Sequence, residues 1–228
     1  MSETVKLKAS DGHPLDAYVA KPHGEPIAGL VVIQEIFGVN AHIRSVADKF
    51  ARHGFYAVAP ALFDRIEAKV ELGYEGQDMQ RAIALMQKLS IDSALKDVEA
   101  ALALAKKQTG KPTMVTGFCY GGTLAWLSAT RLSPAAVVAY YGGQIAKFAA
   151  EKPRVPVLLH FGREDSHIPE SDVALVQKAH PEVKVYWYEG AGHGFNCEAR
   201  SSYNASAAAL AFERTLNFLK SSLANPQG

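Results

Sequence analysis

The sequence predicts an α/β fold, in which a mostly parallel, doubly wound sheet is covered by helices and preceded by an N-terminal β-hairpin. Short apolar runs bounded by turn residues alternate along the chain with longer segments of helical periodicity, and this alternation is typical of βαβ units. The runs are continuously apolar. We therefore expect strands that are buried on both faces, as in a parallel sheet.

The predicted elements follow in order from the N-terminus. Residues 5–18 form two short strands around Asp11-Gly12, a dipeptide that supplies the positive φ values of a tight hairpin turn. Buried strands are expected at 29–33, 56–59, 114–116, 136–140, 156–161 and 183–188. Helices are expected at 42–53, 80–89, 95–107, 123–130, 172–179 and 205–223. The polar stretch 63–76 lacks periodicity, so we expect a long connection at the rim of the active site.

Composition indicates an ordinary globular domain. Of the 228 residues, 48% are hydrophobic and 21% are charged, which excludes a disordered or fibrous chain. We find no internal repeat and no low-complexity linker, so we expect a single domain over residues 1–228. The formal net charge is +1. Because nucleic-acid-binding domains usually carry a strong basic excess, we expect no nucleic-acid partner.

The lack of a targeting signal and the low number of cysteines favour a cytoplasmic protein. The first residues lack a basic segment followed by an apolar one, and the apolar runs are far shorter than the roughly 20 residues of a membrane-spanning helix. We therefore expect no membrane partner. The two cysteines, Cys119 and Cys197, are too few for a disulfide framework, so each is expected to be a free thiol. The sequence leaves the oligomeric state open.

One of the cysteines lies in a motif that carries chemistry. Gly117-Phe118-Cys119-Tyr120-Gly121-Gly122 follows an expected strand and precedes an expected helix, which is the context of a nucleophile elbow. Glycines flank such a nucleophile because a side chain would collide with the backbone of the sharp turn. By chance, this composition would give roughly 0.01 Gly-x-Cys-x-Gly motifs. The alternative is a buried structural thiol beside glycines that pack a helix onto the sheet.

A cysteine nucleophile needs a base and an acid that orients the base. Enzymes with a nucleophile elbow carry these residues in the chain order nucleophile, Asp or Glu, His. Glu164 and Asp165 follow the expected strand 156–161, and His193 follows the strand 183–188. Both turns come after carboxyl ends of strands, where parallel sheets build their sites. His193 would take the Cys119 proton, and one of the two carboxylates would hold the other ring nitrogen. A histidine in a surface loop is the alternative.

The sequence lacks the signatures of cofactor and metal sites. It has no His-Glu-x-x-His, no paired Cys/His spacing, no Gly-x-Gly-x-x-Gly and no complete P-loop, so we expect no cofactor and no metal. His160 falls on an expected buried strand and is expected to be a hydrogen-bonded core residue. Other histidines are expected to be solvated, namely His13, His23, His42, His53 and His180.

Four ordered motifs resemble those of the dienelactone hydrolase family of α/β-hydrolases. They are Gln34-Glu35-Ile36-Phe37-Gly38-Val39-Asn40, Gly117 to Gly122, Phe161-Gly162-x-x-Asp165 and Ala191-Gly192-His193-Gly194-Phe195. The resemblance spans nearly the whole chain and implies an α/β-hydrolase fold. It implies hydrolysis of carboxymethylenebutenolide, an unsaturated γ-lactone that bears a carboxylate, to maleylacetate through a thioester on Cys119. It also favours Asp165 over Glu164 as the acid of the triad.

The resemblance assigns further roles around the nucleophile. In the family, the carboxylate at the position of Glu35 rests against the thiol and takes part in its activation when substrate arrives. Two neighbouring anions repel each other, so such a carboxylate would keep the free enzyme unreactive. The backbone N–H groups of Ile36 and Tyr120 are the implied oxyanion hole. For Glu35, an ordinary carboxylate at a helix N-terminus is the alternative.

The implied substrate-binding residues depart from the family pattern. The best-known members hold the substrate carboxylate with two arginines, and the corresponding positions here are Met79 and Cys197. Arg81 and Arg200 are the nearest substitutes. Further arginines that could reach the rim are Arg44, Arg65 and Arg163, and a solvated surface arginine is the alternative for each.

Two other classes of function stay open at this point. A pocket without the arginine clamp would suit a broader carboxylesterase or thioesterase. A non-catalytic binding protein on the same fold is the alternative from outside the enzymes, because a fold alone does not carry function. A redox thiol protein is less favoured, since Cys119 has no neighbouring cysteine to resolve a disulfide.

Overall fold

A computed structural model describes residues 1–224 of the chain. The chain forms two compact units, of which the first comprises Met1–Val115 and the second begins at Thr116. The boundary between them falls inside strand β5 (Thr113–Phe118). The single domain over residues 1–228 stays a prediction.

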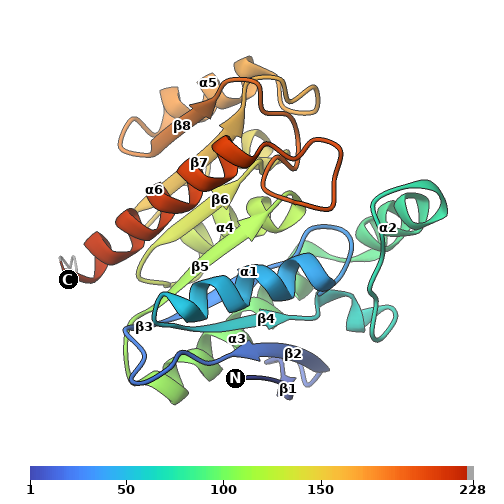
Figure 1. The fold of residues 1–228 in the computed structure, drawn as a ribbon, viewed down its shortest axis with the longest axis vertical. Helices are drawn as coiled ribbons and strands as arrows, with labels where there is room; N and C mark the ends of the chain where they lie inside the picture. The colour runs from blue at the N-terminus through green and yellow to red at the C-terminus, as the bar shows by residue number, and fades with distance from the viewer. Residues whose placement is uncertain (225–228) are drawn as a thin grey trace. The chain divides into compact units, whose positions relative to one another are not determined.

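The first unit packs helices on both faces of its strands. Its elements are β1 (Ser2–Lys8), β2 (Pro14–Ala20), β3 (Ala28–Ile33), α1 (Ala41–Arg52), β4 (Phe55–Pro60), η1 (Leu62–Arg65), α2 (Gly76–Lys88) and α3 (Ile91–Thr109). β1 pairs antiparallel with β2, which confirms the predicted hairpin, and β3 runs parallel to β4. Helices α1 and α3 both pack on β3 and β4, and Figure 1 shows α1 in front of these strands and α3 behind them. Every residue of β3 and β4 is therefore buried.

The second unit continues the alternation of strands and helices. Its elements after β5 are α4 (Tyr120–Arg131), β6 (Val137–Tyr140), η2 (Ile145–Phe148), β7 (Val157–Gly162), α5 (Glu170–Ala179), β8 (Lys184–Tyr188) and α6 (Ala205–Ala224). β7 runs parallel to both β6 and β8. Helix α4 packs on β6 and α6 packs on β7, and Figure 1 draws α6 in front of these strands. The fold class that the sequence predicts is confirmed.

The starts of three helices differ from the prediction. Helix α4 begins at Tyr120 and not at Thr123, α2 begins at Gly76 and not at Gln80, and α3 begins at Ile91 and not at Leu95. Glycine is a poor helix former, so the glycines in the first turns of α4 and α2 conceal the starts of these two helices from periodicity. The predicted connection 63–76 contains most of η1, and its apolar residues Val70 and Leu72 are buried.

Two buried histidines test the expectations for the core. His160 is fully buried, with Nδ1 2.8 Å from the Tyr188 hydroxyl and Nε2 3.0 Å from Thr215 Oγ1, which confirms a hydrogen-bonded core residue. Burial lowers its pKa to about 3, so the ring is neutral. The expectation that His180 is solvated is wrong. It follows the last turn of α5, where the chain turns inward, and its Nε2 lies 2.8 Å from the Ala149 carbonyl oxygen.

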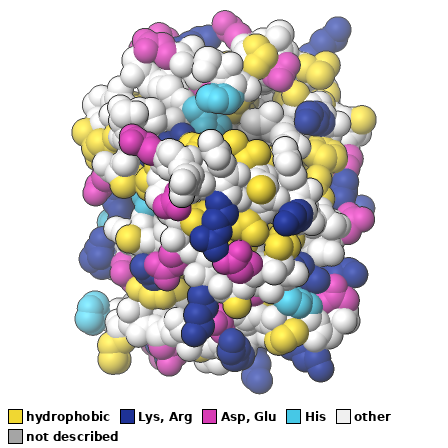
Figure 2. Space-filling view, turned by 90° about the vertical axis from the view of Figure 1, so that its right-hand side faces the viewer, with side chains coloured by type: hydrophobic (Ala, Val, Ile, Leu, Met, Phe, Trp, Pro, Cys, Tyr) yellow, Lys and Arg dark blue, Asp and Glu magenta, His cyan; other side chains and the backbone are white. Residues whose placement is uncertain are grey.

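Charged groups of both signs are distributed over the surface. On the face shown in Figure 2, Lys and Arg side chains alternate with Asp and Glu, as the net charge of +1 leads one to expect. Among residues 1–224, no helix combines the length and the apolar character that crossing a membrane requires.

Arg65 connects three segments of the first unit. Its Nε and Nη2 donate to the two oxygens of Asp97 in α3, at 2.7 and 2.8 Å. Its Nη1 and Nη2 also donate to Asp11, in the turn between β1 and β2, at 3.0 and 3.2 Å. The Asp97 side chain is fully buried and that of Arg65 is 13% exposed. Arg65 thus compensates a buried carboxylate, and each of its three nitrogens donates to Asp97 or Asp11.

We predict that Arg65→Ala lowers the free energy of unfolding by about 3–5 kcal/mol, because it leaves the Asp97 carboxylate buried without its cation. Urea denaturation followed by circular dichroism measures the change. The matched control is Lys21→Ala, which removes an exposed ion pair with Glu3 and should have little effect on stability, because solvent screens such a pair. Equal losses for the two variants would contradict the assigned role of Arg65.

Candidate active site

Cys119 occupies a strained turn between β5 and α4. Its backbone has φ 55° and ψ −118°, in a region that residues other than glycine rarely adopt. Its N–H donates to the carbonyl oxygen of Tyr140, at the end of β6, at 3.0 Å. Its own carbonyl accepts the N–H groups of Gly122 and Thr123 at 2.9 and 3.2 Å. The surrounding backbone therefore holds the strained residue from both sides.

Two glycines make this turn sterically possible. A Cβ atom on Gly117 would lie 1.9 Å from the carbonyl oxygen of Gly121, and one on Gly122 would lie 2.6 Å from that of Tyr140. Both obstacles are backbone atoms, which cannot rotate away as a side chain can. The collision that the motif implies at Gly117 is thus present in the fold.

Three side chains of the second unit form a hydrogen-bonded row. His193 Nε2 lies 3.1 Å from Cys119 Sγ, and His193 Nδ1 lies 2.7 Å from Asp165 Oδ2. The Asp165 side chain is fully buried and that of His193 is 13% exposed. The second oxygen of Asp165, Oδ1, accepts the backbone N–H of His167 at 2.9 Å. This arrangement fixes the ring of His193 between a carboxylate and a thiol.

The two neighbouring carboxylates differ in their surroundings. Asp165 is buried and hydrogen-bonded to His193, whereas Glu164 is exposed and its backbone N–H donates to the Ala191 carbonyl at 3.0 Å. A Cβ atom on Gly162 would lie 2.1 Å from the same Ala191 oxygen. The glycine therefore allows the turn after β7 to approach the loop that carries His193.

Two aromatic residues beside the row were not singled out by sequence reasoning. Tyr140 provides the carbonyl that accepts the Cys119 N–H. Tyr141 is buried with φ 38°, and its ring centroid lies 5.2 Å from that of His193. In the sequence, these two residues are marked by a Tyr-Tyr-Gly-Gly segment at the end of an apolar run. Such a segment also fits an ordinary strand end, so it does not indicate a role in the site.

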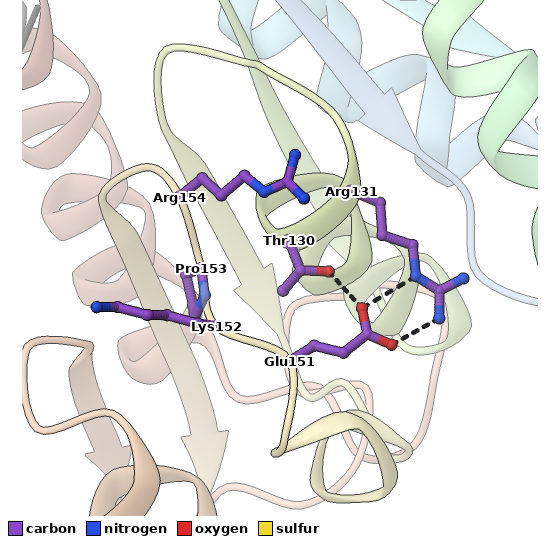
Figure 3. A pocket seen from close by; sticks show the side chains of 6 residues that line it. All are labelled: Thr130, Arg131, Glu151, Lys152, Pro153 and Arg154. Carbon is purple, nitrogen blue, oxygen red and sulfur yellow. Dashed lines mark hydrogen bonds and ion pairs between the residues drawn. The ribbon is translucent and has the colours of Figure 1, made fainter.

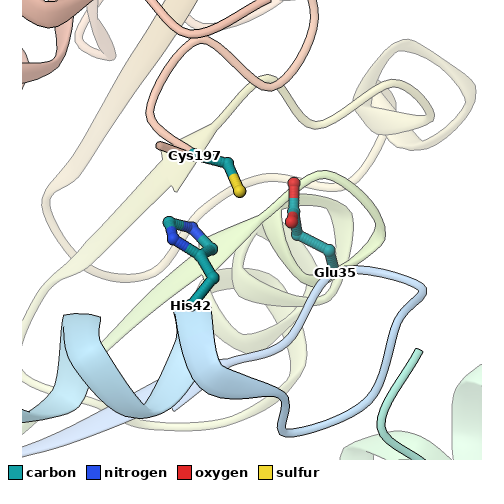
Figure 4. Close-up of side chains that lie close together, drawn as sticks. All are labelled: Glu35, His42 and Cys197. Atoms are coloured by element: carbon teal, nitrogen blue, oxygen red, sulfur yellow. The ribbon is translucent and has the colours of Figure 1, made fainter. Parts of the chain in front are cut away.

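Glu35 and Ile36 belong to the first unit, in the loop after β3. Glu35 is 1% exposed, and a carboxylate so deeply buried is costly unless it is compensated, which disfavours an ordinary surface carboxylate. One of its carboxylate oxygens lies within 4.8 Å of a ring nitrogen of His42, in the first turn of α1. Figure 4 draws both side chains. Their part in the reaction stays a prediction.

Tyr120 is the first residue of α4, so its backbone N–H has no acceptor within the helix and points out of the helix N-terminus. This is the geometry required of an oxyanion-hole donor next to a nucleophile. Its side chain is buried, and burial raises the pKa of the phenol to about 12, so the hydroxyl is neutral at physiological pH.

Arg200 packs against the segment that carries His193. The guanidinium atoms of Arg200 lie 2.7–2.8 Å from the position that a Cβ atom on Gly194 would take. Gly194 follows His193 directly and has φ 79°, so the glycine serves both the backbone conformation and the approach of the arginine. A cation is thus held one residue from the candidate base.

The other candidate arginines have carboxylate partners. Arg81 is 50% exposed and donates to Glu67. Arg163 binds Glu170 at 2.8 Å and Glu189 at 3.3 Å. Arg44 pairs with Glu71 at 2.7 Å. Each of these three arginines therefore already forms an ion pair with a carboxylate.

A hollow of about 640 Å³ in the second unit lies away from the row. It is lined by the residues labelled in Figure 3, which are Thr130, Arg131, Glu151, Lys152, Pro153 and Arg154. Arg131 stands at the end of α4, whereas Cys119 precedes its start, and Arg154 precedes β7, whereas Asp165 follows it. The hollow therefore lies at the opposite ends of the same helix and strand.

Comparison with known proteins identifies the family. The family model of the dienelactone hydrolases matches residues 15–223. The chain belongs to the dienelactone hydrolase family. It is 36% identical to the carboxymethylenebutenolidases of Pseudomonas putida and Pseudomonas knackmussii, over 96% of this chain and 96% of each relative. A solved structure assigned to the dienelactone hydrolases, from Klebsiella pneumoniae, is similar with a TM-score of 0.84 and 26% identity, covering 96% of this chain and 99% of that one.

Membership of the dienelactone hydrolase family settles the class of activity. The protein is a hydrolase that acts on ester or lactone bonds, with a small-molecule ester or lactone as its substrate. The family therefore disfavours a non-catalytic binding protein. It also accounts for an α/β fold with an N-terminal antiparallel hairpin.

Mutation can test which of the two neighbouring carboxylates acts in the reaction, because Asp165 is hydrogen-bonded to His193 and Glu164 is exposed. We predict that Asp165→Asn lowers turnover by ~10³- to 10⁴-fold, because the amide favours the wrong tautomer of His193 while it preserves the shape of the site. Glu164→Gln is the isosteric control and should leave turnover nearly unchanged, since Glu164 is exposed. Steady-state kinetics on one ester substrate compares them, and the reverse ranking would show that the acid is Glu164.

Proposed function

We propose that the chain hydrolyses carboxymethylenebutenolide to maleylacetate, with Cys119 as nucleophile, His193 as general base and Asp165 as the residue that orients His193. The observation that carries the proposal is the row in which His193 bridges the Cys119 thiol at 3.1 Å and the Asp165 carboxylate at 2.7 Å. The activity named for the two Pseudomonas relatives supports the substrate.

The first half of the reaction opens the ring. His193 Nε2 takes the Cys119 proton as Sγ attacks the lactone carbonyl carbon, and the carbonyl oxygen becomes an oxyanion. The C–O bond of the ring then breaks. The ring oxygen leaves as an enolate that stays attached to the acyl chain, and it receives the proton from His193. The product of this half is a thioester between the ring-opened chain and Cys119.

The second half releases the product. His193 removes a proton from a water molecule, which attacks the thioester carbon, and the resulting oxyanion expels the Cys119 thiolate, which takes the proton back from His193. The enol of the released chain becomes the ketone of maleylacetate. Asp165 supports both halves in the same way, because an imidazolium beside a buried carboxylate is more stable than one without it.

Two backbone donors and one buried carboxylate complete the proposal. The backbone N–H groups of Ile36 and Tyr120 stabilise the oxyanion, as preorganised donors do in a site that excludes water. The buried carboxylate of Glu35 opposes formation of the thiolate in the free enzyme and takes part in its activation when substrate arrives. Its burial supports this role, because an anion is retained in an apolar interior only where something is gained from it.

Arg200 holds the substrate carboxylate in this proposal, in place of the missing clamp at Met79 and Cys197. Its guanidinium rests on Gly194, next to His193, which supports a position at the edge of the site. Arg81, which pairs with Glu67, is the alternative candidate for this role. A charge-assisted contact offsets the desolvation of the bound carboxylate and fixes the orientation of the ring.

A broader carboxylesterase or thioesterase is the second candidate. The observation that favours it is the neutral, fully buried Cys197 at one of the positions where the family has an arginine. We also infer a reducing compartment, the cytoplasm, because Cys119 and Cys197 are free thiols and a thiol nucleophile requires reducing conditions. Substrate preference separates the candidates, since the second predicts faster turnover of neutral esters than of dienelactones.

We predict that Cys119→Ala lowers turnover by at least ~10³-fold and leaves the fold intact, because the change removes the nucleophile and only one atom of a half-buried side chain. Mass spectrometry of the wild type, quenched during turnover of a slow ester, should find the acyl group on the peptide that contains Cys119.

The comparison residues are the other thiol and a buried hydroxyl on the same helix. Ser128 Oγ donates to the Leu124 carbonyl at 2.8 Å, and Cys197 is fully buried. Acylation of Cys197 or Ser128 in place of Cys119 would refute the proposed mechanism.

We predict that Arg200→Ala raises KM for an anionic dienelactone by ~10- to 100-fold, which corresponds to about 1.5–3 kcal/mol for a hydrogen bond to a charged group. KM for a neutral ester should not change, because that substrate has no carboxylate to hold. Steady-state kinetics with one substrate of each kind measures the difference.

Arg163→Ala is the control for this experiment, because Arg163 is committed to Glu170 and Glu189. Arg81→Ala tests the alternative candidate. If the Arg200 and Arg81 variants both treat the two substrates as the wild type does, no arginine clamp exists at these positions and the second candidate function is favoured.

A further inference from the structure

Three possible metal ligands converge beside the candidate nucleophile. Asp165, His167 and His193 each offer a ligand atom, and these atoms all lie within 4.8 Å of one another. Asp165 and His193 belong to the row described above. The His167 side chain has no part in the proposed reaction, although its ring centroid lies 5.1 Å from that of His193.

The spacing of these atoms fits a tetrahedral cation. Zinc binds imidazole nitrogen and carboxylate oxygen at about 2.0–2.2 Å, so two of its ligands in a tetrahedron lie about 3.3 Å apart. Here the Asp165 oxygens lie 2.7 Å from His193 Nδ1 and 3.6 Å from His167 Nδ1. One distance, to Oδ2, is shorter than the required one, and the other, to Oδ1, is longer. Small rotations of the side chains would move the ligand atoms by a few tenths of an ångström and bring both distances close to the required value.

The chemistry of the three donors favours zinc over magnesium or calcium. Two imidazoles and one carboxylate form a nitrogen-rich ligand set, whereas the hard cations prefer sites made of oxygen. The carboxylate of Asp165 supplies negative charge in a fully buried position. The His167 side chain is 72% exposed, so the cluster opens to solvent through this ligand and a hydrated cation has a route of entry.

Zinc in this cluster would compete with the proposed catalytic arrangement. In the row, the Nδ1–H of His193 donates to Asp165 Oδ2. A metal bound to Nδ1 replaces that proton, which is released to solvent, and it occupies the carboxylate oxygens as well. His193 then carries a cation directly on its ring and no longer accepts a second positive charge from the Cys119 proton. The cluster therefore has two exclusive states, one hydrogen-bonded and one metal-bound.

We propose that Asp165, His167 and His193 form an inhibitory binding site for Zn²⁺. The inhibition rests on the proposed function, in which His193 is the base, but the binding does not. Sequence spacing gives no sign of such a site, because the ligands come from two loops 28 residues apart.

Binding is tested first, without reference to activity. Isothermal titration calorimetry of the Cys119→Ala variant with zinc chloride excludes the thiol as a ligand. We expect zinc to bind this variant, and an affinity at least ~10-fold lower in the double variant Cys119→Ala, His167→Ala, because one of three protein ligands is lost. His23→Ala, in place of His167→Ala, removes an exposed histidine elsewhere and should leave the affinity unchanged. Equal affinities in all of these variants would overturn the proposed site.

Inhibition is tested second, with each variant's rate expressed relative to its own rate without metal. In buffer free of thiol reductants, zinc should inhibit the wild type, EDTA should restore its rate, and magnesium should have no effect. The zinc concentration for half-inhibition should rise at least ~10-fold in His167→Ala and stay unchanged in His23→Ala.

The outcomes separate the two proposals. Zinc inhibition that is equally strong in His167→Ala means that the metal acts at another place, which overturns the proposed site. Binding that depends on His167 without any loss of activity keeps the metal site and instead contradicts the role of His193 as base.

Discussion

The candidate site depends on one strained residue. A nucleophile at φ 55° is unfavourable for any side chain, and the fold retains it because backbone hydrogen bonds at both its N–H and its carbonyl leave no alternative turn. The same constraint dictates the neighbouring sequence, since Gly117 and Gly122 approach backbone oxygens too closely for a Cβ atom. This turn places the Cys119 thiol at the start of α4, 3.1 Å from Nε2 of His193.

The parallel strands of the second unit explain why the partners of Cys119 can come from distant parts of the chain. β7 and β8 run parallel and end in loops at the same edge, and these loops carry Asp165 and His193. The hydrogen bond between His193 and Cys119 brings the turn after β5 against them. Strand β7 is buried along its whole length and has little freedom to slide, because a shift in register would disturb the packing of its apolar side chains. The distances in the row are therefore set by the core and not by the loops alone.

The buried pair of Asp165 and His193 serves two chemistries in our proposals. A carboxylate that holds an imidazole for proton transfer also offers the oxygen and nitrogen ligands that zinc prefers. The difference lies in His167, which adds a third ligand on the solvent side. An orienting carboxylate next to a histidine-bearing turn thus makes the hydrolase sensitive to a metal that its reaction does not use.

The sequence by itself determined the class of fold, the elbow around Cys119 and the candidates His193 and Asp165, because buried strands, glycine-flanked turns and chain order leave marks in residue type and spacing. It did not determine what depends on contacts between distant segments. The hydrogen bonds of His193 to Asp165 and to Cys119 and the strained Tyr141 beside His193 arise when separate loops meet. Tertiary structure decided these features. Each contact needs residue types that occur at many positions, and the packed core determines which of them come together.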